Sequence, residues 1–264
     1  AEAAAALRDR AGAAAEIAVW AADSLRRGGR LIYIGAGTSG RLGVLDAVEC
    51  VPTFRTDPRE VVGIIAGGPA ALTRAVEGAE DNEEDGRAQV RAIGADARDT
   101  VVGIAACGRT PFVLAALREA KARGARTALV TAGAPPPEEF LDALVLLPSG
   151  PEVLTGSTRL KAGTATKIIL NAISTTAMIC LGKVYRNLMV DLRPTNSKLR
   201  ARAVRLVADL AGADAGEARA ALEAARWRVK VAVVALRKGI AAEDAARLLA
   251  EHGGFLGKAL GEVP

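Results

Sequence analysis

Five short apolar runs, each ending in or near glycine, constrain the fold of this chain more than any other feature. They read RLIYIGAG (residues 30–37), EVVGIIAGG (60–68), TVVGIAACG (100–108), RTALVTAG (126–133) and DALVLLPSG (142–150). Unbroken apolar runs of this length are typical of strands buried on both faces of a parallel sheet. Because segments with helical spacing separate them, we predict an α/β protein with three layers, α/β/α, around a five-stranded parallel sheet.

The remaining segments predict helices and a second domain. Residues 1–29 are rich in alanine and end at a glycine pair, which predicts an N-terminal helix. Residues 69–82 predict the start of a helix, and a long helical pattern covers residues 155–185. After a break at Pro194 a further helix follows, and residues 214–239 and 241–254 predict two or three short helices with glycine stops between them. We therefore expect a sheet domain over residues 1–208 and a small helical domain over residues 209–264.

The loop after the first run matches the glycine pattern G-x-G-x-x-G of dinucleotide-binding proteins at Gly35, Gly37 and Gly40. A dinucleotide site also needs an acidic residue at the end of the second strand. Here that strand ends in IIAGG, and Glu60 lies before the strand instead. The context therefore argues against a dinucleotide site.

Hydroxyl groups point to a different ligand. Thr38 and Ser39 lie just before a predicted helix, where backbone N–H groups and the helix dipole favour a phosphate. The loop CGRTP after the third run repeats the arrangement and places Pro111 in the first helical turn. Two such loops suit one phosphomonoester, although ordinary strand-to-helix turns also use glycine and serine. The predicted phosphate-binding residues are Gly37, Thr38, Ser39, Gly40, Cys107, Gly108, Arg109 and Thr110.

Composition excludes several classes of function. His252 is the single histidine, which argues against a histidine-based triad or a multi-histidine metal site within one chain. We interpret it as a helix-capping residue before Gly253, the alternative being a contribution to a neighbouring subunit's site. The net charge of +5 is spread over helix faces with no basic cluster between aromatics, so no nucleic-acid partner is expected. No signal peptide and no membrane-spanning run are visible. Three cysteines without a C-x-x-C pair predict reduced thiols in the cytoplasm.

Two glutamates are candidates for acid–base chemistry. Glu49 lies in DAVEC between Val48 and Val51, and Glu80 lies in VEGAEDN after the second run. Spacing alone favours solvated surface acids. A carboxyl group buried near a bound phosphate, however, would have a raised pKa and could act as a general acid, and a second carboxylate in a different environment could act as base.

Five motifs together resemble the N-acetylmuramic acid 6-phosphate etherase family of the sugar isomerase (SIS) fold group. They are LIYIGAGTSGRLGVLDAVEC, VVGIIAGGPAALTRAVEGAED, VVGIAACGRTPFV, GPEVLTGSTRLKAGTATK and NLMVDLRPTNSKL, and the resemblance runs from Arg30 to the C-terminus. It implies an SIS fold, a UBA-like helical domain, a homodimer, and a cytoplasmic enzyme of peptidoglycan recycling and amino-sugar catabolism. The implied reaction is a lyase reaction on an amino-sugar phosphate, in which elimination and then hydration release D-lactate without a metal or organic cofactor.

The resemblance also implies roles for individual residues. Glu49 matches the general acid for the departing lactate, and Glu80 matches a second catalytic glutamate, a base at C2 or for the incoming water. Thr38, Ser39 and Thr110 match the sugar-phosphate loops. Candidates for lining the rest of the site are Ser157, Arg159 and Lys161, whose cations suit a phosphate and a lactate carboxylate.

Three positions depart from the family pattern. Val48 and Cys107 stand where the family has serine, and TAGAPPP (131–137) replaces SCNPGS. A thiol is a weaker donor than a hydroxyl, and losing one phosphate hydrogen bond costs roughly 0.5–1.5 kcal/mol. The chain also begins inside the family's usual start. These departures motivate a second hypothesis, a non-catalytic sugar-phosphate-binding SIS regulator like the vertebrate glucokinase regulator. A third, a phosphosugar isomerase, is less favoured because the single histidine lies in the helical domain.

Overall fold

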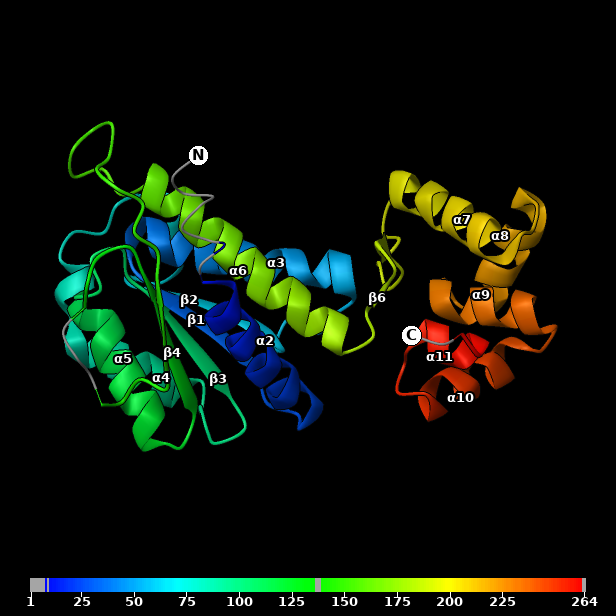
Figure 1. Ribbon diagram of the computed structural model, residues 1–264, viewed down its shortest axis with the longest axis horizontal. Helices are drawn as coiled ribbons and strands as arrows, with labels where there is room; N and C mark the ends of the chain where they lie inside the picture. Colours follow the sequence, from blue (N-terminus) through cyan, green and yellow to red (C-terminus); the bar gives the residue numbers. More distant parts are fainter. Residues whose placement is uncertain (1–7, 9, 136–138, 263–264) are drawn as a thin grey trace. The chain divides into compact units, whose positions relative to one another are not determined.

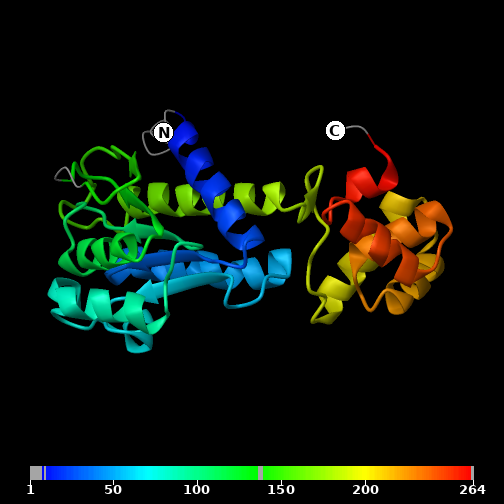
Figure 2. The ribbon, with the colours of Figure 1, turned by 90° about the horizontal axis from the view of Figure 1, so that it is seen from below.

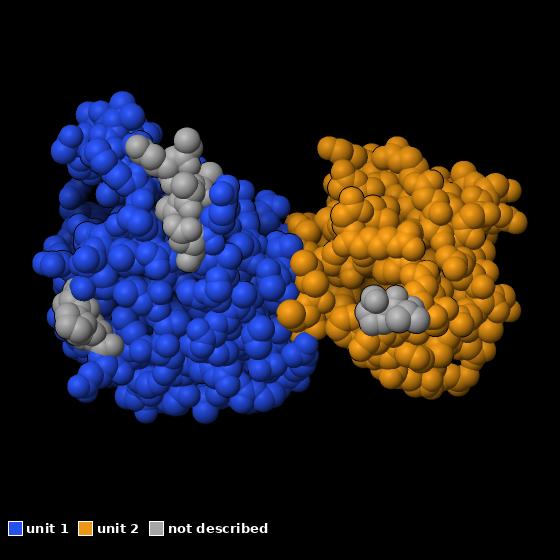
Figure 3. Space-filling view, viewed as in Figure 1, with its two compact units in different colours: residues 1–49, 57–177 blue, residues 50–56, 178–264 orange. Residues whose placement is uncertain are grey.

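The structure is a computed structural model that describes residues 8, 10–135 and 139–262. It divides into two compact units, coloured separately in Figure 3: unit 1 comprises Ala1–Glu49 and Asp57–Ala177, and unit 2 comprises Cys50–Thr56 and Met178–Pro264.

Unit 1 contains the predicted sheet. Five parallel strands lie in the order β2-β1-β3-β4-β5, so the predicted α/β fold and its five strands are confirmed. Figure 1 labels β1 to β4. Gly35, the last residue of β1, pairs with Ile65 on one side and with Ile104 on the other. The strands are β1 (Leu31–Gly35), β2 (Val61–Ile65), β3 (Thr100–Ile104), β4 (Arg126–Thr131) and β5 (Ala143–Leu146).

Helices cover both faces of this sheet and make three layers (Figures 1 and 2). On one face Ile34 and Leu129 pack in a core with Phe112 of α5. On the other face the buried Tyr33 donates a hydrogen bond to the carbonyl of Leu170 in α6. The first face carries α4 (Glu83–Ala92) and α5 (Pro111–Ala122), and the second carries α2 (Ala11–Arg26), α3 (Gly37–Phe54) and α6 (Lys161–Cys180).

The segment between β2 and α4 differs from the prediction. Residues 69–82 were expected to begin a helix, but they form two short 3₁₀ turns, η1 (Pro69–Leu72) and η2 (Ala79–Asp81). The α-helix begins only at Glu83, where the Asn82 side chain accepts a hydrogen bond from the Asp85 amide and caps the first turn. Gly78, with φ of 70°, interrupts the backbone before it.

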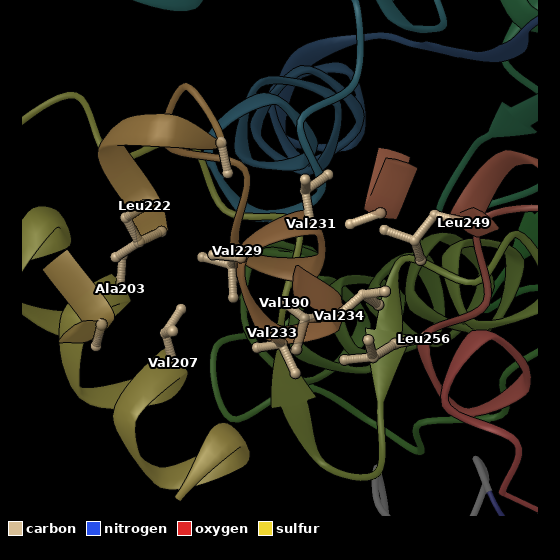
Figure 4. Packing of buried hydrophobic residues seen from close by; sticks show 14 of the residues in the cluster. Val190, Ala203, Val207, Leu222, Val229, Val231, Val233, Val234, Leu249 and Leu256 are labelled. Carbon is tan, nitrogen blue, oxygen red and sulfur yellow. The ribbon is translucent and has the colours of Figure 1, made fainter. Parts of the chain in front are cut away.

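Unit 2 is a helical bundle with a small hairpin. Its buried core joins Val207, Leu222, Val233 and Leu249, which Figure 4 shows packed together. The hairpin strands are β6 (Val184–Tyr185) and β7 (Leu188–Met189). The helices are α7 (Ser197–Ala211), α8 (Ala215–Ala224), α9 (Val229–Lys238), α10 (Ala242–Glu251) and α11 (Leu256–Leu260).

The predicted domain boundary differs from this packing, whereas the predicted short helices agree with it. The predicted domain boundary at 208/209 falls inside α7, whose Ala203 and Val207 are buried in the core of unit 2, so the units divide at 177/178 instead. Residues 214–239 and 241–254, predicted to hold two or three short helices, hold three, α8, α9 and α10, and the short α11 follows them. The UBA-like character of this unit stays a prediction.

The structure places His252 as predicted from its spacing. It is the C-cap residue of α10, and its ring Nδ1 lies 2.9 Å from the carbonyl oxygen of Leu248. Within the ranges described, none of the helices is both long and apolar enough to cross a membrane.

Lys230 is a buried cation in the middle of the apolar run VKVAVV of α9. Its Nζ donates hydrogen bonds to the carbonyl oxygens of Gly182 (3.0 Å) and Gly254 (2.9 Å) and forms an ion pair with Asp191 (2.8 Å). Burial lowers the pKa of Lys230, and Asp191 opposes that shift. All three ammonium protons thus have acceptors, and the side chain ties three segments of unit 2 together.

We expect Lys230→Met to destabilise unit 2 by about 3 kcal/mol, because the carbonyls of Gly182 and Gly254 lose their donor and Asp191 keeps only its longer ion pair with Lys183 (3.7 Å). Urea unfolding followed by the fluorescence of Trp227, in the same unit, measures the loss. Lys238→Met on the exposed end of the same helix is the matched control, and the double variant K230M/D191N should recover part of the loss. Equal stability of K230M and K238M would contradict the assignment.

Candidate functional site

The strand order places the two predicted phosphate loops side by side. The chain passes from β1 to β2 on one side and then returns to β3 on the other side of β1. Open α/β sheets bind ligands at this kind of reversal, beyond the carboxyl ends of the strands. The loops in question, GAGTSG and ACGRTP, follow β1 and β3, so the fold brings them to the same crevice.

The glycines of the first loop serve a close crossing of strand and helix. A Cβ atom on Gly35 would lie 2.6 Å from the amide nitrogen of Gly40, and one on Gly40 would lie 2.6 Å from the carbonyl oxygen of Gly35. Gly37 begins α3 with φ of 51°. Glu60 precedes β2, and its carboxylate accepts a hydrogen bond from the amide of Asp57. The G-x-G-x-x-G pattern here is therefore a packing requirement, without the acid that a dinucleotide needs.

Three hydroxyl groups at these loops have no hydrogen-bond partner among the described residues. Thr38 and Ser39 lie in the first turn of α3 and are half-buried. Thr110 is the N-cap residue of α5, yet its side chain makes no capping hydrogen bond. Within the described parts of the chain, none of these three hydroxyls donates or accepts a hydrogen bond, so all three are available to a ligand.

The second loop is supported by the TAGAPPP segment. The carbonyl oxygen of Ala106 accepts hydrogen bonds from the amides of Ala132 (3.1 Å) and Gly133 (2.8 Å). Gly108 is buried with φ of 73°, and a Cβ there would lie 2.9 Å from Pro135. Residues 136–137 of this segment lie outside the described residues.

The second loop exposes two different side chains. Cys107 is a free, exposed thiol, and Arg109 beside it is exposed. The loop therefore offers the Thr110 hydroxyl, a guanidinium and a weak thiol donor around the buried Gly108.

The start of α6 joins the crevice. A Cβ on Gly163 would lie 3.7 Å from Thr38 Cγ2, so the segment carrying Ser157, Arg159 and Lys161 lies next to the first loop. Ser157 and Lys161 are half-buried, and Arg159 is exposed.

Glu152 has a structural role that sequence reasoning missed. Its carboxylate accepts hydrogen bonds from the amides of Lys161 (2.8 Å) and Ala162 (3.0 Å), which cap α6. These backbone donors hold the pKa of Glu152 below its usual value. The signal in the sequence is an acidic residue shortly before a long helix, but the loop between them hides the pairing.

Glu80 lies next to the start of the first loop. It lines a cavity of about 180 Å³ together with Gly37, Arg41 and Glu77, and its side chain is exposed. Arg41, in the second turn of α3, donates from Nε to the carbonyl of Leu72 and from Nη2 to that of Arg74, both at 3.2 Å. It thereby fastens the loop that carries Glu80 to the helix that carries the hydroxyls.

Glu49 is not brought to this crevice within one chain. It lies on α3 twelve residues after Gly37, a rise of about 18 Å along the helix. Its side chain is exposed, and the neighbouring Val48 is 59% exposed. The single chain therefore shows Glu49 as the solvated surface acid that its spacing favours.

The buried carboxylate on this helix is Asp46 instead. Its Oδ1 accepts hydrogen bonds from Asn171 (2.6 Å) and Ser174 (3.2 Å) of α6, and burial raises its pKa. Asp46 thus links α3 to α6 beneath the site. Sequence reasoning did not single it out, because nothing local distinguishes it from a surface acid.

No three His, Cys, Asp or Glu side chains of the described residues gather into a group that could hold a metal ion. The polar groups of the crevice are hydroxyls, amides, two glutamates and cations, which suits an anionic organic ligand.

Comparison with known proteins supplies the family. A family model described as the glucokinase regulatory protein N-terminal SIS domain matches residues 14–121, which contain the first three strands and both loops. An N-acetylmuramic acid 6-phosphate etherase of Mycolicibacterium smegmatis is 51% identical over 96% of this chain and 84% of its own. The etherase of Cronobacter sakazakii is 54% identical over 91% and 81%, and that of Streptomyces avermitilis is 52% identical over 92% and 78%.

The chain belongs to the N-acetylmuramic acid 6-phosphate etherase family. The resemblance read from the five motifs is thereby confirmed, and so is the SIS fold. In this structure both glycine loops, the loop that carries Glu80 and the start of α6 lie at the carboxyl edge of one sheet.

We expect Arg41→Ala to loosen the loop before Glu80, because two hydrogen bonds to its carbonyls are lost. Hydrogen–deuterium exchange of the amides in residues 70–80 should become about tenfold faster, the effect of roughly 1.4 kcal/mol of local stability. Arg74 contributes only its backbone carbonyl to this contact, so Arg74→Ala is the matched control and should leave exchange unchanged. Unchanged exchange in R41A would show that the loop is held by other means.

Proposed function

We propose that this protein is an N-acetylmuramic acid 6-phosphate etherase, a carbon–oxygen lyase that yields N-acetylglucosamine 6-phosphate and D-lactate. The observation that carries the proposal is the cavity that joins Glu80 to Gly37 of the first phosphate loop. A carboxylate that lines the same cavity as a phosphate-binding loop can act on the carbon atoms of a bound sugar phosphate. Relatives named as etherases, 51–54% identical over at least nine-tenths of this chain, support the same reaction.

The phosphate is proposed to bind at the crevice between β1 and β3. The unpartnered hydroxyls of Thr38, Ser39 and Thr110 would donate to its oxygens, as would the amides in the first turn of α3. The helix dipole of α3 adds to the attraction. The net charge of +5 is favourable for an anionic substrate.

The chemistry follows from the open-chain sugar. Its C1 aldehyde acidifies the C2 proton, which a base removes, and the electron pair forms a double bond as the C3–oxygen bond breaks. The lactyl oxygen takes a proton from a general acid and leaves as D-lactate. Water then adds its hydroxyl to C3 and a proton returns to C2. We assign Glu80 the role of base at C2 or toward the water, since it is the predicted catalytic carboxylate that this cavity contains.

The lactyl carboxylate is proposed to bind near the start of α6. Arg159 and the Lys161 side chain provide cations there, and Ser157 provides a hydroxyl. The amides of Lys161 and Ala162 already bond to Glu152, so side chains rather than the helix end would bind this group.

Glu49 fits the general-acid role only in a homodimer. In the substrate, the phosphorus and C3 are joined by a short chain of covalent bonds. The distance between them is therefore much shorter than the rise of about 18 Å from Gly37 to Glu49. On the same face of α3, Leu45 and Val48 are 47% and 59% exposed. Two exposed apolar side chains beside Glu49 are expected of a surface that a second copy covers. We therefore propose that Glu49 of each subunit completes the partner's site.

The departures from the family pattern modify this site without removing it. Cys107 lies exposed at the edge of the second loop and replaces a hydroxyl donor with a weaker one. Val48 lies on the proposed dimer surface, where an apolar side chain is suitable. The non-catalytic regulator is the less favoured alternative, because both predicted catalytic glutamates are present.

We further propose that the protein works in the cytoplasm. Its exposed cysteine, Cys107, is a free thiol, which suits a reducing compartment.

Measuring D-lactate release from N-acetylmuramic acid 6-phosphate tests the reaction. Glu80→Gln should lower kcat by about a hundredfold to ten-thousandfold, the usual contribution of a general base. Glu83→Gln is the matched control, since Glu83 lies outside the cavity in a surface ion pair with Arg87. No release by the parent, with binding of the sugar phosphate intact by calorimetry, would overturn the enzyme assignment in favour of the regulator.

Mixing two inactive variants tests the shared site. Subunit exchange between Glu49→Gln and Glu80→Gln would create heterodimers with one intact site, and about a quarter of the parent's activity should return. Each variant mixed with itself is the control. No recovery after demonstrated exchange would show that both glutamates act within one chain.

A further inference from the structure

The turn between α8 and α9 has an unusual backbone. No glycine or proline occurs in residues 225–228, although the helix stops there and restarts. Arg226 and Trp227 are consecutive and both left-handed, with φ of 50° and 57°. This conformation is unfavourable for any residue with a Cβ atom, and strain of this kind is often found at functional positions.

Several contacts hold this strained turn in place. The amide of Trp227 donates to the carbonyl of Leu222 at 2.7 Å. The Trp227 carbonyl accepts from Arg55 Nη2 at 2.8 Å, and the same nitrogen donates to Leu192 at 3.1 Å. The guanidinium of Arg200 lies 5.3 Å from the centre of the Trp227 ring. The turn is thus a defined part of unit 2 rather than a loose connection.

The turn presents two arginines to a cavity of about 260 Å³. Arg226 and Arg228 line it, and in the described residues neither guanidinium has a hydrogen bond or an ion pair. The single acidic lining residue is Glu243. The remaining wall is small and apolar and consists of Ala224, Ala225, Val231, Ala242 and Ala246.

Further positive charge lies next to the turn, at Arg55. Burial lowers the pKa of Arg55, and the nearby cations Arg193 and Arg228 lower it further. Asp191 opposes the shift, but its carboxylate already pairs with Lys230. The helices that begin at the cavity, α9 and α10, have no side-chain caps, so their first amides add partial positive charge.

We propose that this cavity binds the phosphate group of a small metabolite, either free phosphate or a sugar phosphate. Two guanidinium groups can take a phosphate in bidentate fashion, and the alanine wall leaves room for a small organic body. The strained turn then has a functional explanation. It lets Arg226 and Arg228, which flank Trp227 in the sequence, line the same cavity. This site lies in unit 2 and does not depend on the function proposed for the β1/β3 crevice.

Trp227 makes the proposal directly testable. The chain has two tryptophans, Trp20 and Trp227, so Trp20→Phe leaves Trp227 as the single reporter. Inorganic phosphate and N-acetylglucosamine 6-phosphate are titrated separately into this full-length variant at constant ionic strength, with chloride as the control anion. A saturable fluorescence change with phosphate but not with chloride is expected. Response to both ligands indicates that free phosphate suffices, and response to the sugar phosphate alone assigns the site to that class.

Two arginine variants and one control locate the binding. Arg228→Gln and Arg226→Gln should each weaken it at least tenfold, whereas Arg219→Gln, an exposed arginine of α8 away from the cavity, should not. Circular dichroism checks that each variant is folded. The titration should be the same with Thr38 and Ser39 replaced by alanine, which separates this site from the crevice of unit 1. The proposal would be overturned if chloride changed the Trp227 fluorescence as much as phosphate does, or if R226Q and R228Q left the phosphate response unaffected.

Glycine at position 226 separates ligand binding from turn geometry. Arg226→Gly removes the guanidinium but suits a φ of 50°, so the midpoint of thermal unfolding should rise while phosphate binding weakens. A higher midpoint with phosphate binding unchanged would mean that the turn has no role in binding, which also overturns the proposal.

Discussion

The close crossing of β1 and α3 is the constraint on which the rest of the site depends. Gly35 and Gly40 touch backbone to backbone, and a single Cβ at either position would place atoms 2.6 Å apart. Because the helix can start so close to the strand, its first turn faces the carboxyl edge of the sheet with the hydroxyls of Thr38 and Ser39. A chain with larger residues here would displace α3, and with it Arg41 and the Glu80 loop that Arg41 holds.

Sheet topology then gathers the other parts. With β1 between β2 and β3, three loops leave the sheet at adjacent points, and each brings one kind of group: hydroxyls, a carboxylate, or a second hydroxyl with a cation. The start of α6 adds the fourth segment through its contact with Thr38. The groups differ in their backbone setting, since phosphate is favoured where helices begin, whereas Glu80 lies in the short 3₁₀ turn η2.

Much of the fold and of the candidate site could be predicted from the sequence, and the predictions that were wrong have physical causes. The strands were predictable because burial on both faces demands unbroken apolar runs, and the two loops because glycine and hydroxyl residues follow them. The helix expected at 69–82 is absent, and the turn that separates α8 from α9 within 214–239 was not located, for related reasons. In both places the local composition favours helix, but the backbone turns at Gly78 in one case and, against intrinsic preference, at Arg226 and Trp227 in the other. Tertiary contacts hold the second turn, such as the hydrogen bond from Arg55 to the Trp227 carbonyl, and no local sequence pattern predicts them.

By itself the sequence determined the α/β class, the five strands, the phosphate loops and the family, because these depend on local periodicity and on motifs in a given order. Only the tertiary structure decided which of these groups meet. It brought Glu80 to the first loop, left Glu49 exposed about 18 Å along the helix, and buried Asp46 and Lys230 among polar partners. Burial and proximity are properties of packing between segments far apart in the chain, and a residue's neighbours in sequence do not contain them.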